Sequence, residues 1–293
     1  MVKVTVPAST ANIGPGFDTL GLALNLYNEF IFEEIDKGLI IEGCPNIFDN
    51  KNNLVYKSFV ITAKKLGEKV KGLKISMNTQ IPVSRGLGSS SACIVGGVFG
   101  ANYLYNGGLS KDELFEIAVM IEGHPDNIAP CVYGGLTASI VEENKPYTMH
   151  YNINEKLKFC ALIPDFETST KEARKLLPEK INFFDAVFNI SRVSFLLKAL
   201  EIGDLNMIGI SLNDKLHQMH RATLIHECDD VSEICSVNGS SAIFISGSGP
   251  TLMNITDNDK LPELIKDSIS KLKHQWEIKL LKTDRNGAKV ETI

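Results

Sequence analysis

The sequence predicts a mixed α+β fold built from two domains. Its 293 residues exceed the roughly 150 of a typical domain, and 44% of them are hydrophobic, which is enough for a sizeable core. Stretches that alternate apolar and polar residues are interleaved with stretches of helical periodicity. They do not follow one another as regular βαβ units, so no parallel-sheet repeat is expected.

The first half of the chain is expected to form a sheet covered by helices. Gly67 is typical of a helix end, and Ser110 followed by Glu113 forms a capping box that opens a helix. Alternation predicts strands over residues 2–6, 28–36, 73–77 and 135–142. Helical spacing predicts helices over residues 53–66, 91–105 and 110–121.

A connection over residues 144–156, which carries Lys and Tyr, is the expected boundary between domains of residues 1–155 and 156–293. Beyond it, helical periodicity dominates residues 170–236. The remaining predicted elements are strands over 157–163, 242–246, 251–255 and 276–282 and a helix over 260–273.

Composition excludes several classes of protein. The formal net charge of −5 disfavours a nucleic-acid binder, because phosphate backbones are held by clustered Lys and Arg. The six cysteines show no Cys-x-x-Cys pair. No apolar stretch reaches the roughly 20 residues that span a bilayer, and the N-terminus does not resemble a signal peptide. A cytoplasmic protein without membrane contact is expected.

Residues 82–92 (PVSRGLGSSSA) are the most informative segment, because they lie between a predicted strand and a predicted helix. Gly86 and Gly88 let main-chain amides approach a ligand, and the helix start supplies unpaired N–H donors and a positive dipole end. Phosphate is therefore the expected ligand. The segment is neither a Walker A loop nor a G-x-G-x-x-G fingerprint, and taken alone it is also compatible with an ordinary helix cap.

Two further Gly-rich segments accompany this loop. Residues 7–18 (PASTANIGPGFD) follow the first predicted strand and place Asn12 and Asp18 on one tight turn. Residues 245–252 (ISGSGPTL) join two predicted strands. Either segment alone can be a structural turn.

In order and position, the three segments resemble the signature motifs of the GHMP small-molecule kinases, and PASTANIGPGFD resembles the homoserine kinase family among them. The resemblance spans essentially the whole chain. It implies an N-terminal domain like the second domain of ribosomal protein S5, a ferredoxin-like C-terminal domain, and ATP bound between them. It also implies ATP-dependent phosphorylation of the L-homoserine side-chain hydroxyl, in threonine biosynthesis, by a homodimer.

The resemblance assigns the nucleotide and Mg²⁺ sites. Ser90, with Ser89 as a close second, matches the serine that holds Mg²⁺, and Glu122 matches the carboxylate, although its spacing to His124 is shorter than in some members. A solvated helix-end carboxylate is the alternative for Glu122. An adenine slot is expected near Asn53 and Val55. The residues expected around the triphosphate are Pro82, Val83, Ser84, Arg85, Gly86, Leu87, Gly88, Ser89, Ser90, Ser91 and Ala92.

The resemblance also assigns a site for a zwitterionic amino acid. Arg174 and Arg221 match two arginines that bind the substrate carboxylate, and Asp18 is expected at the ammonium. Two guanidinium forks suit a carboxylate better than lysines do. Asn12, His124 and Thr170 match further substrate contacts. Without the family resemblance, Arg174 is interpreted as a solvent-exposed charge on a helix, and His124 as a histidine of the core or of a helix cap.

The catalytic base is left open. Asn127 falls where related mevalonate kinases carry an aspartate, so catalysis by positioning and charge stabilisation is preferred, and Asp126 as a base is the alternative. Two other functions remain open, a kinase for mevalonate or another small alcohol and a catalytically silent nucleotide-binding relative. A zinc site at His217, His220, His226 and Cys228 is disfavoured, because no further ligand completes the set.

Overall fold

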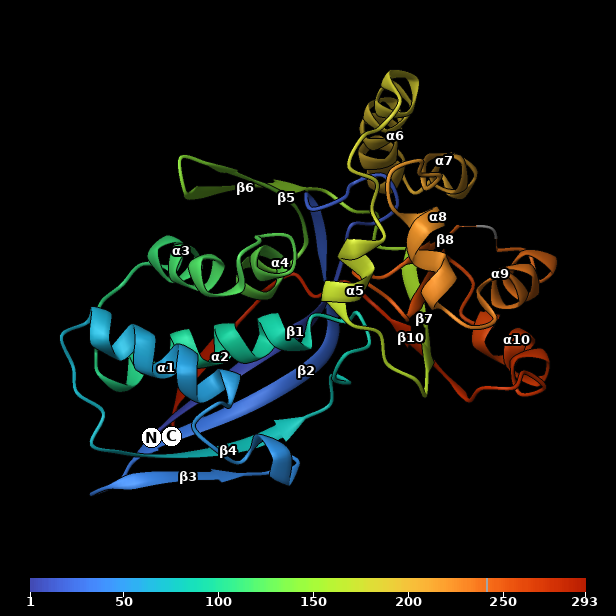
Figure 1. Cartoon of the computed structure of the whole chain (residues 1–293). Helices are drawn as coiled ribbons and strands as arrows, with labels where there is room; N and C mark the ends of the chain where they lie inside the picture. Colours follow the sequence, from blue (N-terminus) through green and yellow to red (C-terminus); the bar gives the residue numbers. More distant parts are fainter. Residues whose placement is uncertain (241) are drawn as a thin grey trace.

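The computed structural model describes residues 1–240 and 242–293, and within them it holds two β-sheets (Figure 1). The first sheet is ordered β11-β1-β2-β4-β3, with β5 and β6 joined to the start of β2. All its pairs are antiparallel except β3 with β4. Its strands are β1 Val2–Ala11, β2 Leu20–Glu34, β3 Gly38–Glu42, β4 Gly72–Thr79, β5 Leu136–Glu142, β6 Lys145–Tyr151 and β11 Lys289–Thr292.

Helices cover one face of this sheet (Figure 1). Most side chains of α2 are buried, and the helix lies directly on β1 and β2. The capping box expected at Ser110 is present and opens α3. The helices of this layer are α1 Leu54–Lys65, α2 Ser89–Leu104, α3 Lys111–Glu122 and α4 Ile128–Tyr133, and the short η1 Asn46–Phe48 precedes them.

The second sheet is fully antiparallel and ordered β10-β7-β9-β8. In chain order these are its fourth, first, third and second strands, which is the ferredoxin-like arrangement that was expected. The strands are β7 Lys158–Pro164, β8 Ile243–Ile245, β9 Leu252–Thr256 and β10 Trp276–Leu281. The helices are α5 Thr170–Lys175, α6 Phe183–Ile202, α7 Leu205–Ser211, α8 Gln218–Arg221, α9 Cys228–Val237 and α10 Leu261–Ile269, with η2 at Ala222–Leu224.

The mixed α+β class is confirmed, and four elements besides the short η1 were not predicted. Strand β3, helix α4 and the last strand β11 were missed, and β6 occupies the stretch expected to be a connection. The division at residue 155 stays a prediction. Two observations bear on it: β11 pairs with β1 in the first sheet, and one cluster of buried residues continues from that sheet to Phe159 and Phe244 of the second.

The loop between β4 and α2 lies where the two sheets meet. The Ser9 amide of β1 donates to the Leu87 carbonyl at 3.2 Å. From the other side, the Ser246 hydroxyl donates to the Gly86 carbonyl at 2.6 Å. Gly86 has φ = 75°, and a Cβ on it would lie 2.2 Å from the Ser246 carbonyl oxygen. The loop is therefore fitted against backbone on two sides.

Gly86→Ala should destabilise the protein more than Gly67→Ala does. Gly67 also has a positive φ, 81°, but nothing lies within 4 Å of a Cβ added there, so only the left-handed strain of about 1–2 kcal/mol applies. At Gly86 the clash with backbone adds to that strain, for a total of about 3 kcal/mol or more. Urea denaturation followed by circular dichroism measures both values. Equal losses of unfolding free energy in the two variants would show that the loop accommodates the added methyl group without a further free-energy cost.

Candidate active site

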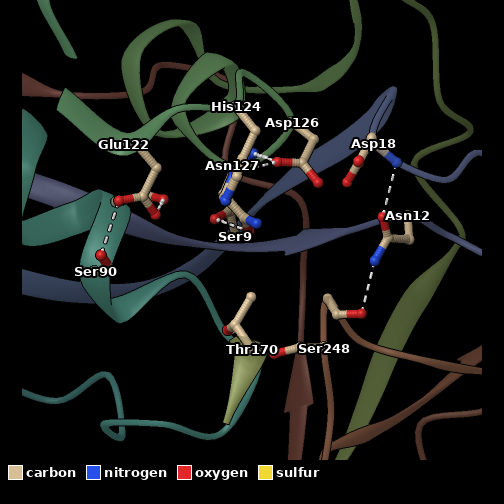
Figure 2. Close-up of polar contacts among 12 residues, drawn as sticks. Ser9, Asn12, Asp18, Ser90, Glu122, His124, Asp126, Asn127, Thr170 and Ser248 are labelled. Atoms are coloured by element: carbon tan, nitrogen blue, oxygen red, sulfur yellow. Dashed lines mark hydrogen bonds and ion pairs between the residues drawn. The ribbon is translucent and has the colours of Figure 1, made fainter. Parts of the chain in front are cut away.

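A cavity of about 820 Å³ lies at the junction of the two sheets. It is lined by the turn after β1, the loop before α2, the segment after α3, the start of α5 and the loop between β8 and β9. In Figure 2, Ser90 and Glu122 lie at one end, Asn12 and Asp18 lie at the other, and His124, Asp126 and Asn127 lie between them. The three segments predicted to act together thus meet in one cavity.

Helix α2 begins at Ser89 and aims its N-terminus at this cavity. Its N-cap is Gly88, which has φ = 70° and no side chain to form a cap hydrogen bond. The first-turn amides of α2, which have no partners within the helix, are therefore left uncapped. Such a turn is an anion-binding site. Of the predicted triphosphate residues, eight line the cavity, namely Val83, Ser84, Arg85, Gly86, Gly88, Ser89, Ser90 and Ser91.

The other three predicted loop residues have different surroundings. The Leu87 and Ala92 side chains are fully buried in the core, and Pro82 does not line the cavity. Arg85 lies at the cavity wall, but its guanidinium donates to the Pro164 and Asp165 carbonyls at 2.9 Å and pairs with Glu167 at 3.2 Å. Arg85 therefore ties the loop to the end of β7.

Two hydroxyls converge on the carboxylate of Glu122, and Figure 2 shows the contact with Ser90. Ser90 Oγ donates to Glu122 Oε2 at 2.9 Å, and Ser91 Oγ donates to Oε1 at 3.0 Å. Glu122 is the last residue of α3, which packs against α2. The predicted pair of Ser90 and Glu122 is thus in direct contact, and Ser91 joins it in place of the alternative Ser89.

The turn after α3 holds a buried carboxylate. Asp126 is 3% exposed, and its Oδ1 lies 3.1 Å from His124 Nδ1 and accepts from the Asn127 amide at 2.9 Å. The hydrogen bond to Asp126 raises the pKa of His124 above 6.5, against the opposing effect of burial. Ser9 Oγ donates to Asn127 Oδ1 at 2.8 Å, which ties this turn to β1.

Asn12 organises the opposite end of the cavity. Its Nδ2 donates to the Gly247 carbonyl at 2.6 Å, and its Oδ1 accepts from the Asp18 amide at 3.0 Å (Figure 2). Arg221, only 2% exposed, donates to the same Gly247 carbonyl at 3.0 Å. Thr170 Oγ1 lies 3.1 Å from Ser248 Oγ. Asn12 thus joins the first predicted segment to the third.

Arg174 and Asp18 form a bidentate ion pair, with Nη2 to Oδ1 at 2.7 Å and Nη1 to Oδ2 at 2.9 Å. This hydrogen bonding raises the pKa of Arg174. The sequence had suggested a separate substrate charge for each partner. The two side chains come from positions 156 residues apart, and no local pattern reveals such a pairing.

The apolar end of the cavity lies beside the start of α1. Asn53 lines it and caps α1 by accepting from the Val55 amide at 2.9 Å. Val55, the other predicted residue, is buried in the core, and its neighbour Leu54 lines the cavity instead. Sequence reasoning missed the other apolar lining residues, because they follow the unpredicted strand β3 or lie at the end of β4. They are Cys44, Pro45, Phe48 and Met77.

The histidines of the disfavoured zinc site are engaged elsewhere. His217 is fully buried, with Nε2 2.7 Å from the Gly14 carbonyl, and His226 stacks on His274. Burial lowers the pKa of His217. Among the described residues, no group of three or more His, Cys, Asp and Glu side chains is arranged to hold a metal ion.

Models of the N-terminal and C-terminal domains of GHMP kinases match residues 53–135 and 196–275. The homoserine kinase of Clostridium botulinum (strain Loch Maree / Type A3) is 47% identical over 292 residues, covering 99% of this chain and 98% of that protein. The homoserine kinase structure from Cytophaga hutchinsonii superposes with a TM-score of 0.88 at 29% identity, covering 99% of this chain and 97% of the other.

A Methanococcus jannaschii mevalonate kinase shares the fold, with a TM-score of 0.72 at 16% identity over 97% of this chain and 98% of the other. The two-domain GHMP kinase fold that the sequence predicted is therefore confirmed. Full-length identity of 47% combined with matches to both family models shows that the chain belongs to the homoserine kinase family of the GHMP kinases.

Proposed function

We propose that the chain transfers the γ-phosphoryl group of ATP to the side-chain hydroxyl of L-homoserine and so makes O-phospho-L-homoserine for threonine biosynthesis. The observation that carries the proposal is the different chemistry of the two ends of this cavity. One end offers a helix N-terminus and the Ser90–Glu122 pair, and the other offers two guanidinium groups and one carboxylate. A polyphosphate suits the first end, and an amino acid suits the second.

At the substrate end, the charges complement a zwitterion. Arg221 and Arg174 supply two cations for the carboxylate, and Asp18 supplies an anion for the ammonium. Arg174 already holds Asp18 through two of its donors, so homoserine would bind by sharing or exchanging these partners. Thr170, Asn12 and His124 line the same cavity and would shape the space for the side chain.

At the nucleotide end, the loop before α2 would hold the triphosphate through main-chain amides, and the adenine would lie against Phe48, Leu54 and Met77 beside Asn53. The donor set of Ser90 and Glu122 fits Mg²⁺, because this ion prefers hard oxygen ligands and takes one or two from the protein. When bound, Mg²⁺ neutralises charge that develops on the phosphate oxygens.

Catalysis by positioning is favoured over a carboxylate base. The Asp126 carboxylate already contacts His124 and the Asn127 amide, which commits it to holding the turn. The homoserine oxygen would form the new bond to the γ-phosphorus as the bond to the bridging oxygen of ADP breaks, and the hydroxyl proton would pass to a phosphoryl oxygen. A loose transition state permits this late proton transfer. Asn127, fixed by Ser9, would orient the reacting groups.

The variants Glu122→Gln and Asp126→Asn distinguish the roles of the two carboxylates in this region. Glu122→Gln should lower kcat by about 100-fold or more and raise the Mg²⁺ concentration needed for half-maximal rate, because metal charge stabilisation is worth several kcal/mol. Asp126→Asn should lose no more than about tenfold, which is 1.4 kcal/mol. Steady-state ADP release across Mg²⁺ concentrations measures both. A larger loss in Asp126→Asn with a changed pH profile would favour a base.

ADP release, measured separately with L-homoserine, with mevalonate and without an acceptor, tests which substrate the enzyme phosphorylates. Homoserine should be turned over best, and Arg174→Ala should raise its KM about 10- to 100-fold, because a charged hydrogen bond is worth about 1.5–3 kcal/mol. Arg285→Ala, whose salt bridge to Glu155 lies outside the cavity, serves as the matched control. Preference for mevalonate would point to another small-alcohol kinase, and ATP binding without turnover to a silent relative.

We also propose a cytoplasmic enzyme without nucleic-acid partners. All six cysteines are unpaired in the structure, as is usual in a reducing compartment, and the net charge of −5 does not favour phosphate backbones. No helix in the described ranges has the length and apolar character needed to cross a bilayer.

We propose that the protein is a homodimer joined through helix α6. This helix exposes an unusual apolar stripe, and such faces mark protein contacts. Its members are Phe183, Phe184, Val187, Ile190, Phe195 and Ile202, each 47–77% exposed. Light scattering should give twice 32.2 kDa for the wild type and a single chain for Ile190→Glu, with circular dichroism confirming an intact fold. A monomeric wild type at about 50 µM would contradict the proposal.

A further inference from the structure

The ring of Phe17 contacts both arginines proposed to bind the substrate carboxylate. The guanidinium carbon of Arg221 lies 4.8 Å from the ring centroid, and that of Arg174 lies 5.6 Å from it. Both distances are within the roughly 6 Å at which a cation is attracted to an aromatic face. The imidazole of His217 also packs on Phe17, with ring centroids 4.9 Å apart. Phe17 itself does not line the cavity, so it lies behind the arginines.

The turn that carries Phe17 is firmly held. The Thr19 and Leu20 amides both donate to the Gly16 carbonyl, at 3.0 and 2.9 Å. Asn12 holds the Asp18 amide, and His217 contacts the Gly14 carbonyl. Because the backbone is fixed on both sides of residue 17, the ring is a rigid surface.

The two arginines need such a surface. Both are cations and lie near each other, so each disfavours the charged form of the other. Burial lowers the pKa of Arg221, and the positive charge of Arg174 lowers it further. Asp18 compensates Arg174 through the bidentate pair. Arg221 is 2% exposed. Among the described residues its side chain makes one hydrogen bond, to the Gly247 carbonyl, and its Nε has no partner. The Asp18, Asp126 and Asp214 carboxylates favour that buried charge from a distance, and the Phe17 face supports it in direct contact.

We propose that Phe17 is a positioning residue that holds Arg174 and Arg221 in place for an α-carboxylate and so makes the site selective for an amino acid over a simple alcohol. This inference rests on the proposed function, in which those arginines bind the homoserine carboxylate. One anion, Asp18, and one ring, Phe17, follow each other in the chain and together constrain both cations. An incoming carboxylate then meets two guanidinium groups whose positions are already fixed, which reduces the entropy lost on binding.

Fluorination of Phe17 tests the inference without changing the shape of the side chain. Replacing it with 4-fluoro- and then 3,4,5-trifluorophenylalanine weakens the negative ring face stepwise. The KM for homoserine should rise at each step, to about 5- to 10-fold for the trifluoro form, while kcat and the KM for ATP stay within about twofold. Phe17→Tyr, which keeps the face, should match the wild type within about twofold.

A double-mutant cycle gives a second readout that a purely structural role would not produce. Introduced into the wild type, Phe17→Leu should raise the homoserine KM about 5- to 50-fold. Introduced into the Arg174→Ala variant, it should raise the KM much less, because the contact between Phe17 and Arg174 is already absent there. An unchanged homoserine KM in the fluorinated series overturns the positioning role. If homoserine is not a substrate, or if Arg174→Ala and Arg221→Ala leave its KM unchanged, the proposed function fails first and this inference with it.

Discussion

The contact between the loop before α2 and the two sheets is the constraint on which the site depends. One side of the loop bonds to Ser9 of β1 and the other to Ser246 beyond β8. Each of these residues also reaches a second part of the site: Ser9 holds Asn127, and Ser246 precedes Gly247, whose carbonyl holds Asn12 and Arg221. A shift of this loop would therefore move the proposed phosphate-binding turn, the turn that carries Asn127 and the proposed substrate end of the cavity together.

Several charged groups of the site are satisfied by one another. Glu122 accepts from Ser90 and Ser91, Asp18 from Arg174, and Asp126 is paired with His124. Buried polar groups without partners are costly, so these pairs keep the cavity stable while they hold each side chain in one orientation. Each proposed ligand offers chemistry equivalent to that of the partner it would replace. A divalent cation would take the place of the hydroxyl protons between Ser90 and Glu122, and a zwitterion would match the charges of Asp18 and Arg174.

The features of the fold that depend on neighbouring residues could be predicted well from the sequence. The N-terminus of α2, the capping box of α3 and the four strands of the second sheet were predicted from neighbouring residues, whereas the order of those strands was implied by the family resemblance. Two of the missed strands lack a clear local pattern. β11 is only four residues long and pairs with β1 from the other end of the chain, and β6, which forms a hairpin with β5, exposes both polar and apolar side chains. The difference between Val55 and Leu54 at the cavity is one helix position, which only the packing of α1 against α2 decides.

The turn after β1 explains why the two arginines are not equivalent. Arg221 is buried, fixed to Gly247 and packed on Phe17, so its position does not depend on substrate. The Arg174 side chain is 37% exposed, stands on the short helix α5 and is held by Asp18, a partner that can itself bind an ammonium group. A carboxylate would therefore bind first to a cation that is already in place, and the ammonium on the same carbon would then compete for Asp18. Both charges of one amino acid would then be recognised together, because Arg174 can offer the carboxylate the N–H groups that Asp18 does not use while Phe17 keeps the guanidinium in place.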